Sequence, residues 1–111
     1  MTHRQLAMIA ALACSSAHAA ARGAGVSLPE TRTVHIAQFA FSPAELDVSA
    51  GDTIVWSNTD ALRHTSTSDS AVWASPELAD GERFVWVAAR AGRFPYHCAA
   101  HPVMHGLIVV R

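Results

Sequence analysis

The chain carries the stretch Tyr96-His97-Cys98-Ala99-Ala100-His101-Pro102-Val103-Met104 near its last residue. A thiolate, an imidazole and a thioether follow one another here at equal spacing, because two residues separate Cys98 from His101 and His101 from Met104. Copper sites that carry electrons use two histidines and one cysteine in a trigonal arrangement, with a weak axial methionine. The stretch therefore offers three of the four ligands of such a site.

The residues before Cys98 predict how this ligand loop is held. In a β-strand, successive side chains point to opposite faces. If Cys98 faces the inside of a sandwich, Tyr96 faces inside as well and His97 faces away. The chain must then turn, and His101 and Met104 can fold back on the thiolate.

The missing histidine is predicted to be His64. It follows a predicted strand at 53–57 and a turn at 58–60, so it lies in a loop at a strand end. His35 lies on the polar side of an alternating strand, and His105 follows the last ligand directly, so both are expected to point elsewhere. The predicted site is one type 1 copper ion bound by His64, Cys98, His101 and Met104.

The ligand types indicate electron transfer rather than catalysis. Thiolate and imidazole suit both oxidation states of copper, whereas a thioether favours Cu(I). This set leaves no obvious open position for a substrate, so we expect the protein not to be an enzyme. Zinc fits less well because methionine is not among its usual ligands. Two alternatives stay open: copper storage or delivery to an oxidase, and a structural module that merely retains the loop.

Short runs with strand character recur between turn signals, at 33–36, 45–49, 53–57, 84–87, 93–98 and 107–110. Such runs predict an all-β sandwich. We expect Gly106 to admit the chain to the last strand at low steric cost. Residues 71–79 are the one candidate for a short turn of helix. Phe39 and Phe41 alternate beside Pro43 and are interpreted as core or edge packing rather than as part of a ligand pocket.

The N-terminal residues are interpreted as a targeting segment. Residues 1–19 combine a weakly basic start, an apolar Ala-rich run and the small-x-small pattern Ala17-His18-Ala19, which is typical of a signal peptide. The apolar run is too short to span a membrane. Residues 20–30 then form a flexible linker, and residues 31–111 the copper-binding domain. We expect a periplasmic protein whose mature domain does not insert into the membrane.

The number of cysteines and the balance of charged residues further limit the class of protein. The sequence around Cys14 loosely resembles a bacterial lipidation motif but lacks the Leu that usually precedes the cysteine. Attachment to a membrane through a lipid on Cys14 is therefore the less favoured alternative. Cleavage after residue 19 would leave Cys98 as the one thiol, which cannot form an internal disulfide and is available to a metal. Eight Arg and Lys balance nine Asp and Glu. This balance gives no indication of a nucleic-acid partner.

From Phe41 onwards the chain resembles the cupredoxins, most of all the amicyanins, with pseudoazurin and plastocyanin as relatives. The matching stretches are Phe41-Ser42-Pro43-Ala44-Glu45, Gly51-Asp52-Thr53-Ile54-Val55-Trp56, His64, Tyr96-His97-Cys98 and His101-Pro102-Val103-Met104-His105-Gly106. The resemblance implies a Greek-key β-sandwich with type 1 copper at one end, carrying single electrons in the periplasm. It also implies that His101 reaches the surface among Ala61, Leu62, Pro102 and Val103. The expected partners are c-type cytochromes or a periplasmic dehydrogenase or reductase, and we expect a monomer.

The chain departs from this pattern at three places. Many relatives have Asn directly after the upstream histidine, where it ties the two ligand loops together; Thr65 stands here and still offers a hydroxyl and a backbone N–H. Arg63 and Ala100 replace the prolines common in amicyanins. Residues 71–83 lack the Met-rich, Lys-bearing character of a carrier dedicated to methylamine dehydrogenase, so the resemblance names no electron donor.

Overall fold

Strands make up all the regular secondary structure of residues 28–111, the part of the chain that the computed structural model describes. In chain order they are β1 (Thr31–Ala37), β2 (Ala40–Ser42), β3 (Glu45–Val48), β4 (Thr53–Asn58), β5 (Thr67–Ser68), β6 (Arg83–Val87), β7 (Gly92–His97) and β8 (His105–Val110). This range holds no helix long and apolar enough to cross a membrane. The predicted signal peptide 1–19, the lipidation at Cys14 and most of the linker 20–30 lie outside the described residues.

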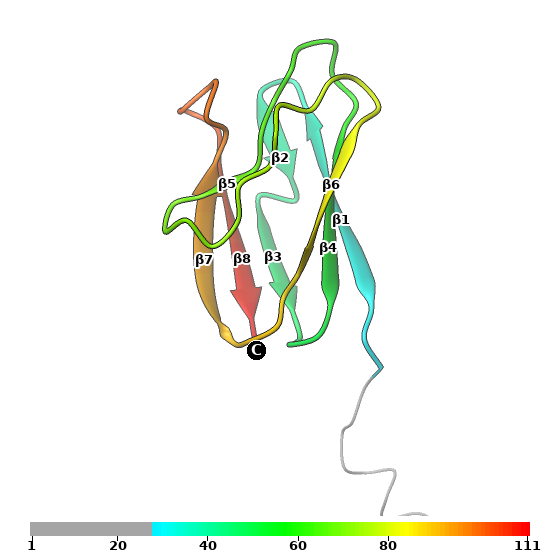
Figure 1. The fold of residues 1–111 in the computed structure, drawn as a ribbon, viewed down its shortest axis with the longest axis vertical. Coiled ribbons are helices and arrows are strands. Elements are labelled where there is room, and N and C mark those ends of the chain that lie inside the picture. The colour runs from blue at the N-terminus through cyan, green and yellow to red at the C-terminus, as the bar shows by residue number, and fades with distance from the viewer. Residues whose placement is uncertain (1–27) are drawn as a thin grey trace, which may run out of the picture.

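The strands form two four-stranded sheets that face each other (Figure 1). One sheet has the order β2-β1-β4-β6 and the other the order β3-β8-β7-β5. Each contains one parallel pair, β1 with β4 and β3 with β8, and its other pairs are antiparallel. The predicted all-β sandwich is therefore confirmed.

Alternation along the strands supplies the core between the sheets. Val34 and Ile36 of β1 are fully buried, as their period-two pattern predicts. On β7, Tyr96 is buried and His97 is partly exposed, and the next residue, Cys98, is fully buried. The predicted orientation of this stretch is thus confirmed, and it places the thiol in the hydrophobic core.

Three connections meet at one end of the sandwich, the upper end in Figure 1. They are the β1–β2 turn at 38–39, the β4–β5 connection at 59–66 and the β7–β8 loop at 98–104. A hydrogen bond from the Gln38 N–H to Asp60 joins the first two, and one from the Thr65 N–H to the Cys98 sulfur joins the last two. All the predicted ligands lie in this group of loops or directly beside it.

The prediction of a helical turn at 71–79 is wrong. This stretch pairs with the chain after β4 instead, through isolated bridges of His64 with Leu78 and of Thr67 with Ala74. Two backbone hydrogen bonds, each between an N–H and a carbonyl of His64 and Leu78, hold the first bridge. Since these amide groups are used between segments, they are not free for a helix.

Gly106 is required for a different reason from the one predicted. It lies inside β8, directly opposite Tyr96, and its φ is outside the left-handed region. A Cβ at this position would overlap the Tyr96 ring. The ring therefore covers the glycine backbone, and close approach rather than backbone freedom explains the residue.

Candidate metal centre

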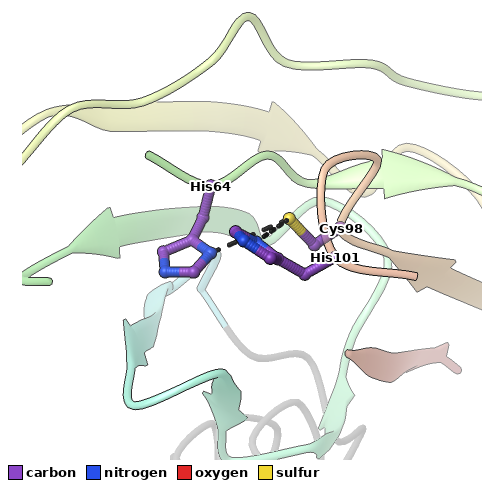
Figure 2. A group of neighbouring side chains, drawn as sticks. All are labelled: His64, Cys98 and His101. Atoms are coloured by element: carbon purple, nitrogen blue, oxygen red, sulfur yellow. Dashed lines mark hydrogen bonds between the residues drawn. The ribbon is translucent and has the colours of Figure 1, made fainter. Parts of the chain in front are cut away.

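Three of the four predicted ligands converge on one point (Figure 2). The Cys98 Sγ lies 3.8 Å from His64 Nδ1 and 3.7 Å from His101 Nδ1. Metal–nitrogen and metal–sulfur bonds of about 2.0 and about 2.3 Å at trigonal angles would leave nitrogen and sulfur about 3.7 Å apart. The three side chains therefore fit a single ion bonded to all of them.

The β7–β8 loop is closed by its own backbone. The His101 N–H donates to the Cys98 carbonyl, the Met104 N–H to the His101 carbonyl, and the Cys98 N–H to the Met104 carbonyl, at 3.2, 2.9 and 3.2 Å. The equal spacing seen in the sequence thus becomes a loop in which each predicted ligand residue is joined to the next by a backbone hydrogen bond. Met104 is 2% exposed and belongs to the core cluster. Its role as axial ligand stays a prediction.

Burial distinguishes the two histidines. His64 is fully buried, whereas His101 is partly exposed. Apolar side chains of the same group of loops are exposed around this end, with Phe39 at 50%, Leu62 at 47% and Val103 at 83%. The site is therefore closed on the His64 side and reaches the surface on the His101 side.

Thr65 ties the two ligand loops together. Its backbone N–H donates to the Cys98 Sγ at 3.4 Å, and its Oγ1 accepts a hydrogen bond from the Ala99 N–H at 2.8 Å. A second hydroxyl, that of Thr67, lies 2.9 Å from the same Oγ1. The link that relatives make with Asn is present here with Thr, and hydrogen bonding to the cysteine sulfur is one of the factors that tune a copper potential.

Asp60 contacts the predicted ligand His64, and the sequence pattern did not predict this contact because Asp60 was interpreted only as part of a turn. Its Oδ2 lies 3.2 Å from His64 Nε2 and accepts a hydrogen bond from the Gln38 N–H. A carboxylate on one ring nitrogen fixes the tautomer and leaves Nδ1 free for a metal. The His64 contact is the main reason why the pKa of Asp60 lies below its usual value; the N–H groups of Leu62 and Gln38 act in the same direction, and desolvation opposes them.

Phe39 contacts both of the imidazoles that are predicted to bind the metal. Its ring is edge-on to His64, with centroids 5.9 Å apart at 85°, and to His101, 5.1 Å apart at 88°. The interpretation of Phe39 as core or edge packing rather than as part of a ligand pocket is therefore wrong, whereas Phe41 is buried in the core as predicted. Gln38 and Phe39 form a two-residue turn with φ of 53° and 57°, and this left-handed backbone redirects the Phe39 ring.

The remaining histidines in the described range lie away from the cluster, as expected. His35 and His105 are exposed. His97 points outward, where its Nδ1 lies 2.6 Å from Asp69 Oδ1. This second histidine–carboxylate pair has the same chemistry as the pair of His64 and Asp60, but it lies outside the cluster of predicted ligands.

The fold and the site together define a β-sandwich with one mononuclear metal site at one end. The family profile described as Cupredoxin-like domain matches residues 5–110, and the chain belongs to this family. The predicted cupredoxin-type fold and amicyanin-like character are confirmed. So is the predicted cofactor, since one type 1 copper ion is the cofactor of these proteins.

Relatives and solved structures agree with this assignment. The chain is 34% identical to amicyanin-alpha of Methylorubrum extorquens over 117 residues, covering 96% of this chain and 98% of the relative. It is 32% identical to amicyanin of Paracoccus denitrificans over 82 residues, covering 69% of this chain but 63% of that relative's length. The Cu(I) form of an amicyanin variant gives a TM-score of 0.70 at 30% identity, covering 79% of this chain and 88% of that one. A purple cupredoxin from Nitrosopumilus maritimus gives 0.69 at 28%, covering 72% and 99%.

Proposed function

We propose that the protein carries single electrons between redox partners in the periplasm. One type 1 copper ion, bound by His64, Cys98, His101 and Met104, would hold the electron. The observation that carries the proposal is the set of nitrogen–sulfur distances of 3.7 and 3.8 Å, which suit a trigonal ion.

The chain's own contacts explain why such a site suits a carrier. Copper supplies the one-electron chemistry when it is bound. Asp60 holds the His64 ring, Thr65 holds the Cys98 sulfur, and backbone hydrogen bonds close the loop around His101. A ligand frame fixed by the protein rearranges little when charge changes. This frame therefore favours fast electron exchange over ligand turnover.

Electrons would enter and leave through the partly exposed His101. The exposed apolar side chains of Phe39, Leu62 and Val103 surround this end, and a small patch suits the brief encounters of redox proteins.

The partners would be c-type cytochromes or a periplasmic dehydrogenase or reductase, with the carrier acting as a monomer. The targeting pattern of residues 1–19 supports the periplasmic location.

An optical spectrum tests the copper assignment. Reconstitution with Cu(II) should give an intense blue thiolate-to-copper band, and Cys98→Ser should abolish it. His97→Ala is the matched control, because this neighbouring side chain points outward and its loss should leave the band unchanged. A colourless copper-loaded protein, or a blue Cys98→Ser variant, would overturn the assignment.

Two further measurements test the axial role of Met104 and distinguish electron transfer from copper storage or delivery. Met104→Gln should keep copper and colour but lower the reduction potential, since an amide oxygen favours Cu(II); an unchanged or higher potential would count against axial ligation. Electron self-exchange measured by NMR should be fast. Very slow self-exchange would favour the other candidate, copper storage or delivery.

A further inference from the structure

The oxidisable aromatic side chains of the chain form one contact group. The chain has three Trp and one Tyr, and Trp73 contacts the other two indoles. Its ring centroid lies 4.3 Å from that of Trp86 and 5.3 Å from that of Trp56, at interplanar angles of 36° and 35°. The ring centroid of Tyr96 lies 5.9 Å from that of Trp73 and 5.4 Å from that of Trp56. Ring contacts this close allow an electron to pass from one side chain to the next.

Trp73 is also connected to the ligand sulfur through hydrogen bonds. Its Nε1–H donates to the Ser66 Oγ at 2.9 Å, and both side chains are buried. Ser66 is joined by one peptide bond to Thr65, whose N–H donates to the Cys98 Sγ at 3.4 Å. Two hydrogen bonds and a short covalent segment therefore lead from the indole to the thiolate. Electron tunnelling decays less steeply along such a path than through a gap.

Trp86 brings the other end of this path to the surface. It is partly exposed, whereas Trp56 and Trp73 are 0% and 5% exposed. It lines a cavity of about 390 Å³ whose other residues include Val72, Arg90 and Phe94. Residues of the turn between β6 and β7 also line this cavity. Figure 1 shows that turn at the opposite end of the sandwich from the ligand loops.

We propose that Trp86, Trp73, Ser66 and Thr65 form a second electron route, by which a strong one-electron oxidant at the Trp86 surface is reduced by the centre at Cys98. The inference rests on the proposed function, because the electron comes from reduced copper. The oxidant, a small inorganic radical, takes one electron from the Trp86 indole and leaves its radical cation. An electron from Trp73 refills Trp86, and one from the reduced centre refills Trp73. The net change is one electron moved from Cu(I) to the oxidant, with no proton released.

The parallel route through Trp56 and Tyr96 is less suited to this transfer. The Trp56 Nε1 and the Tyr96 hydroxyl have no hydrogen-bond partner among residues 28–111. Oxidation of a phenol normally releases its proton, which needs an acceptor, and an indole cation is stabilised by a hydrogen bond such as that of Trp73. Trp56→Phe therefore serves as the matched control for Trp73→Phe.

Pulse radiolysis in azide solution tests the route, because the azidyl radical oxidises accessible indoles. The blue band of the Cu(II) protein is recorded first, and the protein is then reduced. After the pulse, the indole radical should decay while the blue band appears, in a phase whose rate does not depend on protein concentration. This phase should be lost in Trp73→Phe and retained in Trp56→Phe, and Trp86→Phe should lower the initial radical yield.

Apoprotein provides a readout that does not depend on copper. There the radical should persist, and mass spectrometry should find oxidised indole at Trp86 and Trp73. Ser66→Ala keeps every ring and should slow the delayed phase, which covers the case in which Trp73→Phe does not fold. An unchanged delayed phase in Ser66→Ala or in folded Trp73→Phe, or radical decay by bimolecular reaction alone in wild type, would overturn the route. Absence of the blue band at the start would instead overturn the proposed function.

Discussion

Replacing Asp60 by alanine removes the one acceptor that the described residues give to the outer nitrogen of His64. In the copper-bound form His64 must use Nδ1 for the metal, so its proton lies on Nε2 and faces Asp60 at 3.2 Å. Without copper the proton can move to Nδ1 instead. The loss of Asp60 therefore weakens the copper-bound form more than the apoprotein, and we expect it to lower copper affinity.

The structure sets the size of this effect. The His64 side chain is fully buried, and a buried polar group left without a partner costs about 1–3 kcal/mol. Loss of a residue that orients a metal-bound histidine typically lowers affinity by about 10- to 100-fold. The two figures agree, because every factor of ten corresponds to about 1.4 kcal/mol. We expect Asp60→Ala to fall in this range and Asp60→Asn, which keeps an acceptor oxygen, to restore most of the affinity.

Competitive titration against a chelator of known affinity measures the change for Cu(I) and Cu(II). Asp69→Ala is the matched control, since it removes the same charge and a carboxylate 2.6 Å from His97, a histidine outside the cluster. Its copper affinity should equal that of wild type. Equal affinities of Asp60→Ala and Asp69→Ala would refute the assigned role of Asp60.

Three shorter predictions concern stability. Gly106→Ala inserts a methyl group against Tyr96 and should destabilise the protein by about 1–3 kcal/mol; an unchanged melting temperature in calorimetry would contradict the packing described. Copper removal should lower the melting temperature, because the metal binds the folded state; equal values with copper verified as bound would argue against a stabilising site. The N–H groups of Glu30 and Ser49 hold the pKa of Asp52 below its ordinary value of 3.8, so its carboxylate stabilises the fold above that pH and loses this effect as pH falls through the folded value. Urea unfolding should show a deficit of Asp52→Asn at neutral pH that shrinks in acid, and a deficit that does not change with pH would exclude this role.

The parts of the fold that sequence could predict are those set by local patterns. Equal spacing from Cys98 to Met104 and alternation in Val34 and Ile36 depend only on neighbours along the chain, so the ligand loop and the sandwich follow from them. The prediction of a helical turn at 71–79 was wrong because pairing with a distant segment outweighed the local helical preference of these residues. Local sequence patterns contain no information about contacts between segments that lie far apart in the chain.

Phe39 and Asp60 show the same limit within the site. Alternation puts Phe39 on the same face as Phe41, but the turn at 38–39 has left-handed backbone without the Gly or Asn that would indicate it. The hydrogen bond from Gln38 to Asp60 spans 22 positions in the sequence. A carboxylate four residues before a ligand histidine was the one signal that pointed to Asp60.

The chain leaves the described sandwich at the end opposite the ligand loops. The C-terminus lies at this end in Figure 1, and Leu28 and Arg111 both line a cavity together with Asp47 and Asp52. A fused protein or an electrode surface attached at either point would therefore hold the domain with the His101 end facing outward. Immobilised molecules would all present the same end to a diffusing partner, so crowding at the support should not block their exchange of electrons.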